Sequence, residues 1–358
     1  MARRRRRKKY STGRQALIMV AELLTVVILF VLVAALYQWS RIGHNSLDPS
    51  KLEAYHDTGP YTNIALFGAD AREGGIDKGA NTDTMIIASI KNKTKEVRLI
   101  SVYRDTLMQQ KDGTYFKANS AYHKGGGEEA IAELNRNLDL DIKNYVCVNF
   151  AAMIKAIDAV GGIEVDVQEE EISYINGYAT EIIKVTGIDS EGVYHAGPQT
   201  LNGVRATAYA RIRYTEGGDF KRTERQRFIL SELLKKAKKL SIGELQALAD
   251  EIMPMISTSF SATDILSLAV NLPKYELVEA KGFPFEVTTK TNPRGLQGDF
   301  VVPVDLSANV KELHEYLFDN TSYRPSKKVK KISDEIIYLT GVTADAESIY
   351  QQDKKSDE

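Results

Sequence analysis

The sequence predicts an α/β domain that stands behind one N-terminal transmembrane helix. Short apolar runs rich in β-branched residues, which are typical of buried strands, alternate along the chain with segments of helical period. At 358 residues, with 43% hydrophobic and 27% charged content, the chain can bury a sizeable core. A long apolar segment follows a basic N-terminus, and this order is typical of a membrane anchor.

The basic N-terminus and the apolar segment predict the topology. Residues 1–15 carry eight positive charges and no acidic residue, and residues 16–37 carry one charge, Glu22. As a helix the apolar segment would span about 33 Å at about 1.5 Å per residue, enough to cross the hydrocarbon core. It is longer than the apolar part of a secretory signal peptide and lacks a small-residue cleavage site, so we expect an uncleaved signal-anchor helix. The positive-inside rule then predicts a single-pass type II protein of the cell membrane, with residues 1–15 in the cytoplasm. Residues 38–60 are expected to form a stalk, and the body is expected outside the cell.

The charge balance argues against a nucleic-acid partner. The whole chain has a formal net charge of −1 and residues 1–15 contribute +8, so the remainder carries −9. DNA binding depends on neutralising phosphates, for which an acidic body is poorly suited. The basic run is therefore interpreted as a topological signal rather than a nucleic-acid tail. A single cysteine, Cys147, excludes an intramolecular disulfide and a cysteine metal cluster.

Three apolar runs at the start of the body predict neighbouring strands. They are residues 63–67, 84–90 and 96–103. The polar sequence KNKTK between the second and third runs is typical of a hairpin. If the hairpin closes around residues 92–95, Asp83 lies about opposite Arg104. The open edge of the sheet would then display residues of both charges: Asp70, Arg72, Asp83, Arg104 and Asp105.

The middle of the chain continues the alternation of helices and strands. Helices are expected at residues 128–138 and 150–160, and strands at 142–148 and 163–167. Lys117 precedes a GGG sequence, which we interpret as a flexible turn because the strand and lysine spacing of a Walker loop are missing. Residues 168–196 are poorly periodic and are expected to form a lid or an insert.

The densest group of cations lies between Leu201 and Arg227, where six arginines and one lysine occur. Residues 210–214 are expected to be extended, which would place Arg211 and Arg213 on one face. A Gly-Gly-Asp turn that ends at Asp219 precedes a basic, amphipathic helix. Basic residues at a helix N-terminus are unfavourable unless an anion pairs with them. The ordinary alternative is a solvated face with internal ion pairs.

The C-terminal third predicts further helices and strands before a polar tail. Helices are expected at residues 243–252, 264–272 and 309–318, and strands at 275–279 and 300–304. The body is therefore extended to about residue 323. Residues 324–358 are charged and polar and are expected to be mostly disordered.

The gathered charges suggest a phosphate site with a metal. Two carboxylates bind magnesium incompletely, and phosphate oxygens can complete its shell while arginines pair with the same phosphates. Magnesium, or manganese, is therefore the expected cofactor. Histidines such as His123 and His195 lie in loops without a partnered Ser or Cys motif, and no zinc-ligand spacing occurs.

Seven motifs in order carry a family resemblance: NIALFGADAR, NTDTMIIASI, ISVYRDT, KANSAY, VGGIEVDV, LNGVRATAYARIR and GDFKRTERQ. Together they cover about residues 62–239, and the chain resembles the LytR-CpsA-Psr family of bacterial cell-wall enzymes. The resemblance implies a three-layer α-β-α domain with a central mixed sheet over residues 61–323. It also implies a phosphotransferase that moves a glycopolymer from a polyprenyl-pyrophosphate carrier to peptidoglycan as a phosphodiester. The polymer could be a teichoic acid, a capsule or a rhamnose-rich polysaccharide.

The resemblance also assigns residues. It implies that Asp70 and Asp83 hold the metal, and that the pyrophosphate is contacted by Arg72, Arg104, Lys117, Arg211, Arg213 and Gln226. Arg222 and Arg225, from the basic helix, are added to this set. Ala69 departs from the small hydroxylated residue common in the family and leaves the charged positions intact.

Several roles stay open at this point. Arg104 and Asp219 are the catalytic candidates, with Asp219 as the general base or the cap of the following helix, and Asp105 as the alternative base. Phe150, Ile154 and Ile157, with residues 228–234, are the candidate lipid-binding wall, although a plain core would use the same pattern. A hydrolase on the same site and a non-catalytic regulator of the cell envelope or of transcription are the alternative functions.

Overall fold

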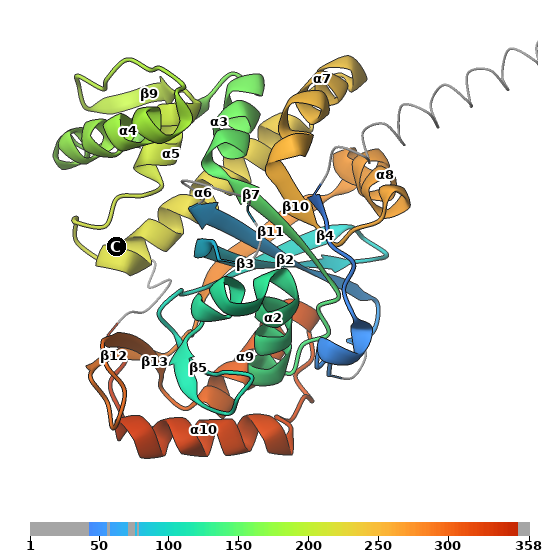
Figure 1. The fold of residues 1–358 in the computed structure, drawn as a ribbon, viewed down its shortest axis with the longest axis vertical. Helices are drawn as coiled ribbons and strands as arrows, with labels where there is room; N and C mark the ends of the chain where they lie inside the picture. The colour runs from blue at the N-terminus through green and yellow to red at the C-terminus, as the bar shows by residue number, and fades with distance from the viewer. Residues whose placement is uncertain (1–42, 56–57, 71–75, 77–78, 350–358) are drawn as a thin grey trace, which may run out of the picture.

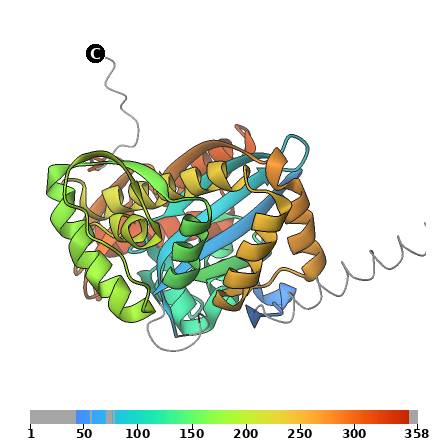
Figure 2. The ribbon, with the colours of Figure 1, turned by 90° about the horizontal axis from the view of Figure 1, so that it is seen from above.

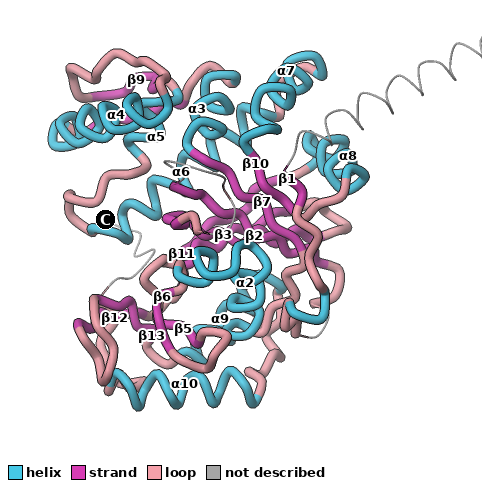
Figure 3. The backbone as a smooth tube through the Cα atoms, in the orientation of Figure 1, coloured by secondary structure: helices cyan, strands magenta, loops and turns pink. Residues whose placement is uncertain are grey.

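A seven-stranded mixed sheet forms the centre of the molecule (Figures 1 and 3). The computed structural model describes residues 43–55, 58–70, 76 and 79–349. In spatial order the strands are β1 (Gly43–His44), β10 (Ile256–Thr258), β7 (Asn144–Asn149), β2 (Tyr61–Asp70), β3 (Asn81–Lys91), β4 (Glu96–Val102) and β11 (Glu276–Phe283). The pairs β1/β10, β7/β2 and β4/β11 are parallel and the others antiparallel, so the expected α/β fold with a mixed sheet is confirmed.

Alternation along the strands gives the sheet two apolar faces. In β2, Ala65 and Phe67 belong to one core, whereas Ile64 and Leu66 belong to another, because successive side chains point to opposite faces. The first core is covered by α2 (Ser120–Leu138), α9 (Leu306–Phe318) and α10 (Lys327–Thr340). The second is covered by α6 (Gly218–Ala237) and α8 (Ala262–Asn271). Seen from above, the yellow helix α6 lies across the strands (Figure 2).

A third core belongs to a module beside the sheet. It contains α3 (Phe150–Ala159), β8 (Ile163–Val167), α4 (Ile172–Thr186), β9 (Gly197–Leu201) and α5 (Gly203–Tyr209). Strands β8 and β9 pair antiparallel, and Figure 1 shows α4, α5 and β9 grouped beside α3. Residues 168–196, expected to be a lid or an insert, form part of this module through the apolar face of α4.

Smaller elements complete the body. They are β5 (Leu107–Gln109), β6 (Tyr115–Lys117), α7 (Ile242–Ile252), β12 (Val287–Thr291), β13 (Asp299–Pro303) and the 3-10 turns η1 (Pro49–Lys51), η2 (Glu169–Glu171), η3 (Met253–Met255) and η4 (Leu272–Lys274). The helices and strands expected in the C-terminal third are confirmed, each within a few residues.

The triple-glycine sequence, expected to be a flexible turn, lies inside α2. Gly126 has φ of 68° and ψ of −157°, a non-helical conformation that divides α2 into two helical segments joined at a kink. A Cβ atom on Gly127 would lie 2.4 Å from the ring of Tyr145, so the helix can approach β7 only with glycine there. The chain therefore turns at Gly126, as expected, but helix continues on both sides of the turn, and close packing on the sheet selects glycine at position 127.

The body extends further at both ends than the sequence indicated. The described part of the expected stalk pairs with β10 through β1 and buries Leu52, so it belongs to the domain. In the expected disordered tail, α10 buries Val329, Ile332 and Ile336 against the first core. Among the described residues no helix is long and apolar enough to cross a membrane. The predicted anchor at residues 16–37 lies outside the described residues.

Candidate active site

The hairpin of β3 and β4 brings Asp83 and Arg104 together. Ile86 pairs with Ser101, and the same register places residue 83 opposite residue 104. Nη1 of Arg104 donates to Oδ1 of Asp83 at 2.7 Å. Burial alone would raise the pKa of Asp83, but Arg104 and then Arg222 outweigh it, so the pKa lies below its ordinary value. Asp83 is therefore a charged carboxylate within a group of arginines.

Arg211 and Arg213 reach the same region from a loop. Helix α5 ends at Tyr209 and residues 210–217 form a loop of turns, bends and irregular backbone, so the expected strand-like segment is wrong. Nη2 of Arg213 donates to Oδ2 of Asp83 at 3.2 Å. The guanidinium of Arg211 lies over the rings of Phe150 and Tyr178, at 5.1 and 4.9 Å from the centroids. The loop thus brings both arginines to the same cavity, as expected, although its backbone conformation is not the extended strand that the sequence predicted.

Asp219 lies in the first turn of α6. The N-cap residue is Gly217, which has φ of 85° and offers no side chain, so the expectation that Asp219 caps the helix is wrong. A carboxylate in the first turn still interacts favourably with the helix dipole. Oδ2 of Asp219 accepts from Nη2 of Arg222 at 3.1 Å. Oδ1 is buried and makes no hydrogen bond, and lies 3.8 and 3.7 Å from Nε of Arg104 and Arg213.

Arg222 is the most buried arginine of the group, with 2% of its surface exposed. Its Nη2 also donates to the backbone carbonyl of Asp83 at 3.4 Å. Burial lowers its pKa to about 10, against the opposing effect of Asp219. The helix therefore places a desolvated cation directly over the start of β3, where an anionic ligand would find a strong partner.

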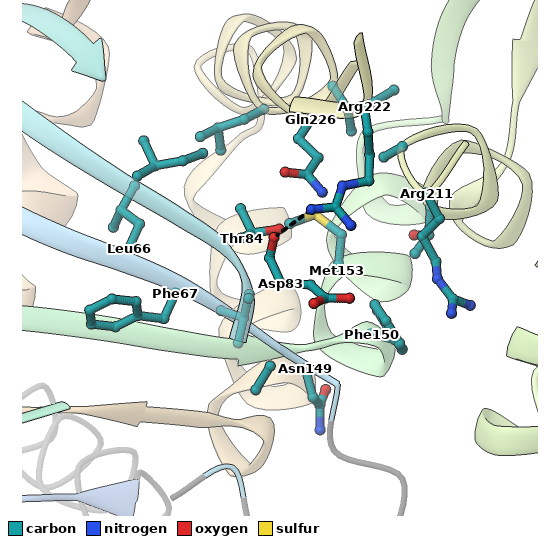
Figure 4. Close-up of a pocket in the computed structure, with 18 of the residues that line it drawn as sticks. Leu66, Phe67, Asp83, Thr84, Asn149, Phe150, Met153, Arg211, Arg222 and Gln226 are labelled. Carbon is teal, nitrogen blue, oxygen red and sulfur yellow. Dashed lines mark hydrogen bonds between the residues drawn. The ribbon is translucent and has the colours of Figure 1, made fainter. Parts of the chain in front are cut away.

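A cavity of about 510 Å³ opens between the sheet, α3, α4 and α6. One part of its wall is polar and includes Asp83, Asn149, Arg211, Arg213, Arg222 and Gln226. The rest is apolar and includes Leu66, Ile86, Val146, Phe150, Met153, Ala156, Ile229, Leu230 and Leu233. Figure 4 shows Arg222 and Gln226 pointing from α6 toward Asp83, near Met153 and Phe150 of α3. The cavity can hold a ligand with an anionic head and a long apolar tail.

Several predicted residues do not line this cavity. Ile154 and Ile157 are 0% exposed and pack inside the third core, so their assignment to the lipid wall is wrong. On α3 the cavity face is Phe150, Met153 and Ala156, at helical spacing. Arg225 turns away from the cavity: it is buried against Glu171 at 2.7 Å, so its assignment to pyrophosphate is also wrong.

Three further predicted residues lie outside the cavity wall and are linked by ion pairs: Arg104, Asp105 and Lys117. Arg104 contacts Asp83 and does not itself line the cavity. Nζ of Lys117 pairs with Oδ1 of Asp105 at 2.9 Å, and Asp105 also lies 3.4 Å from Nε of Arg104. These residues therefore contact Asp83 or one another and do not form the wall of the cavity.

The sequence did not single out Tyr178, Tyr214 and Asn149, which also line the cavity. Asn149 caps α3, since its side chain accepts from the backbone of Ala152 at 2.9 Å. The Asn-Phe start of an apolar helix is a cap signal that was available. Tyr178 lies in the poorly periodic residues 168–196, and Tyr214 ends the segment that was expected to be extended; no local signal marked either as a cavity residue.

The metal expectation rests on two carboxylates. The backbone of Asp70 pairs with Asn81 at the end of β2, but its side chain, like all of Arg72, lies outside what the structure describes. Within the described residues no three His, Cys, Asp or Glu side chains gather as a metal site. Charged Asp83, two residues from Asn81, suits magnesium, which commonly takes one or two carboxylates and completes its shell with substrate phosphates. Of the two expected ligand carboxylates, the structure describes the side chain of Asp83 alone, and its two oxygens accept from Arg104 and Arg213.

Comparisons with known proteins agree with the motifs. The profile of the LytR_cpsA_psr family matches residues 34–299. The chain is 29% identical over 212 residues to polyisoprenyl-teichoic acid–peptidoglycan teichoic acid transferase TagU of Enterococcus faecalis, covering 58% of this chain and 64% of that protein. It is 32% identical over 195 residues to the transferase TagV of Bacillus subtilis, covering 52% of this chain and 47% of that protein. The matched part thus spans about half to two thirds of these relatives.

A solved structure shares the fold. It is described as the LytR-CPS2A-psr family protein YwtF (TagT) with bound octaprenyl pyrophosphate lipid. The likeness has a TM-score of 0.51 at 19% identity, and covers 84% of this chain and 100% of that one.

Proposed function

The chain belongs to the LytR_cpsA_psr family, and we propose that it is a membrane-anchored extracellular phosphotransferase that moves a glycopolymer from a polyprenyl-pyrophosphate carrier to peptidoglycan. The observation that carries the proposal is one cavity whose wall is cationic in one part and apolar in the rest. The relatives named as teichoic acid transferases, and the related protein with a bound octaprenyl pyrophosphate, support the same assignment. Teichoic acid is accordingly the proposed polymer.

The apolar wall suits the isoprenoid. This wall is formed by residues of three elements: Met153 and Ala156 of α3, Leu230 and Leu233 of α6, and the strand residues Leu66 and Ile86. An isoprenoid has no hydrogen-bonding group, so it gains free energy by leaving water for such a channel.

The polar wall suits the pyrophosphate. Arg211, Arg213 and Arg222 supply planar guanidinium forks that match phosphate oxygens, and Gln226 adds an uncharged donor. Asp83 and Asp219 already hold Arg213 and Arg222 in place. Because these cations are fixed before the ligand arrives, they can stabilise the charge that develops during phosphoryl transfer without reorganising.

The reaction proceeds at the phosphorus that carries the sugar. A hydroxyl oxygen of peptidoglycan forms a new P–O bond there, and the bond to the bridging oxygen breaks, so that polyprenyl phosphate leaves. The product is a phosphodiester between the polymer and peptidoglycan. The hydroxyl proton passes to a base, for which we propose Asp219, whose Oδ1 makes no hydrogen bond and lies 3.7 Å from Nε of the cavity residue Arg213. Asp219 does not itself line the cavity, so this role requires the acceptor hydroxyl to reach it beside Arg213.

Magnesium is proposed as the cofactor. Asp83 and Asp70 would hold it together with phosphate oxygens of the substrate, and when bound it would neutralise charge on those oxygens. Arg104 is proposed to act by holding Asp83, which it contacts at 2.7 Å.

The experiment that tests the proposal is product analysis with the purified full-length protein in detergent. The donor is a polyprenyl-pyrophosphate disaccharide labelled in the sugar, and it is supplied with or without peptidoglycan. Label that becomes attached to peptidoglycan as an acid-labile phosphodiester supports transfer. Release of free sugar phosphate at the same rate with and without peptidoglycan would instead identify a hydrolase. No consumption of the donor would favour the non-catalytic regulator.

A further inference from the structure

Tyr214 combines two properties that a core residue would not have. Its side chain lines the cavity, yet 72% of its surface is exposed. It directly follows Arg213, which contacts Asp83. An aromatic ring that stays this exposed at the rim of a charged cavity buries little of its surface in the fold and is available to a ligand.

A second ring from another element holds Tyr214 in place. The ring of Tyr174, in the first turn of α4, lies 6.0 Å from that of Tyr214, and the planes are tilted by 33°. Aromatic pairs at this separation attract each other, so the two rings form a surface that exists before a ligand binds. The platform, defined as Tyr174 and Tyr214, is therefore shared between the arginine loop and the α4 module.

The platform continues into the polar wall of the cavity. Tyr178 lies one turn after Tyr174 on α4, so both side chains share one helix face. Tyr178 lines the cavity and stacks under Arg211 with a centroid distance of 4.9 Å. A ligand bound to the arginines would thus leave the cavity along a row of tyrosines.

We infer that the platform binds the pyranose ring that is attached to the donor pyrophosphate. The inference rests on the proposed function, because it needs a phosphate at the arginines. A pyranose ring has an apolar face of C–H groups that packs on aromatic rings, and hydroxyl groups at its edge that remain in water. The ring is covalently joined to the phosphate, and Arg213 and the exposed Tyr214 both line the cavity, so a phosphate at Arg213 can place the sugar at Tyr214. The platform then selects donors that carry a sugar over the bare lipid.

The test compares two probes with the full-length protein in detergent. One is polyprenyl pyrophosphate and the other is the same lipid carrying a single N-acetylhexosamine. Tyr214→Ala should weaken binding of the glycosylated probe about tenfold and leave the bare probe within about twofold, because only the sugar loses its stacking surface. Tyr214→Trp should preserve the preference, since the tryptophan ring also stacks. Tyr194→Ala is the matched control: Tyr194 is 80% exposed but does not line the cavity, so neither probe should change.

Each other outcome overturns the inference. Equal weakening of both probes would mean that Tyr214 only shapes the arginine loop. Unchanged donor binding with a raised KM for peptidoglycan would assign the platform to the acceptor. If wild-type protein binds neither probe, the proposed function fails and the platform with it. If wild-type protein binds both probes equally well, the platform fails and the proposed function stands.

Discussion

Arg104 and Asp83 join the ends of two antiparallel strands through a contact of 2.7 Å between Nη1 and Oδ1. The other carboxylate oxygen accepts from Arg213 at 3.2 Å. One carboxylate therefore fixes a cation of the sheet edge and a cation of the cavity wall at the same time. The charged site depends on a pairing that the strand register sets.

Asp83→Asn should change how stability depends on pH. The pKa of Asp83 lies below its ordinary value of 3.8, so its ionised form stabilises the fold above that pH, and this contribution is lost as pH falls through the lowered pKa. The difference in unfolding free energy between wild type and Asp83→Asn should be constant near neutral pH and shrink below about pH 4. Urea denaturation at several pH values measures it. A difference that grows toward acid would contradict the assigned charge pair.

Arg222→Lys should make lipid binding sensitive to alkaline pH. Burial lowers the pKa of Arg222 to about 10, and a lysine, with an ordinary pKa of about 10.4, would be shifted toward neutrality by the same burial. The Kd for polyprenyl pyrophosphate should rise about tenfold between pH 7 and 9 in the variant and stay flat in wild type. Arg213→Lys is the control, because Arg213 is more exposed and its lysine should weaken binding equally at both pH values. Parallel pH profiles for the two variants would remove the special role of Arg222.

Two neighbouring positions on α3 should separate lipid binding from stability. Ala156→Trp fills the cavity and should raise the Kd for polyprenyl pyrophosphate more than tenfold while changing the unfolding free energy little. Ile154→Ala should do the opposite, since it leaves a hole in a closed core, at a cost of about 2 to 5 kcal/mol. Isothermal titration and urea denaturation measure the two effects. The reverse order would place the lipid elsewhere.

Asp219→Asn should slow transfer without weakening donor binding. The amide keeps the shape and can still accept from Arg222, but it cannot take up the proton, so transfer should fall by roughly 10² to 10⁴-fold. Single-turnover transfer with bound donor isolates this step. Near-normal transfer would leave Asp219 with the structural role of fixing Arg222 and Arg213.

The sequence predicted those features of the fold that are determined by residues close together in the chain. The KNKTK hairpin has one favourable register, and this alone placed Asp83 opposite Arg104. The arginines between Leu201 and Arg227 indicated an anion site, because so many cations at a helix N-terminus are unfavourable unless an anion pairs with them. The strand expected at residues 210–214 failed because alternation over five residues does not distinguish a strand from turns that end a helix.

Other features depend on contacts between distant segments. Composition suggested a disordered tail, but burial of Ile332 and Ile336 against the first core holds α10 in place. The apolar stripe of α3 has two uses: Met153 faces the cavity and Ile154 faces the module core. Because adjacent residues of α3 are similarly hydrophobic, the sequence does not show which of them face the cavity and which face the module core; the packing of the helix decides this. Arg225 is likewise one residue from Gln226 yet binds Glu171, because a helix turns successive side chains about 100° apart.

Photo-crosslinking tests the central claim, that one cavity holds the whole carrier head and the start of its tail. The probe is polyprenyl pyrophosphate with a diazirine in the first isoprene units, bound to the full-length protein, with label sites mapped by mass spectrometry. We predict labels on Met153, Leu230 and Leu233, which are lost on competition with unlabelled polyprenyl pyrophosphate and strongly reduced in Arg213→Ala. Labels confined to other elements, or labels that competition does not remove, would contradict the account.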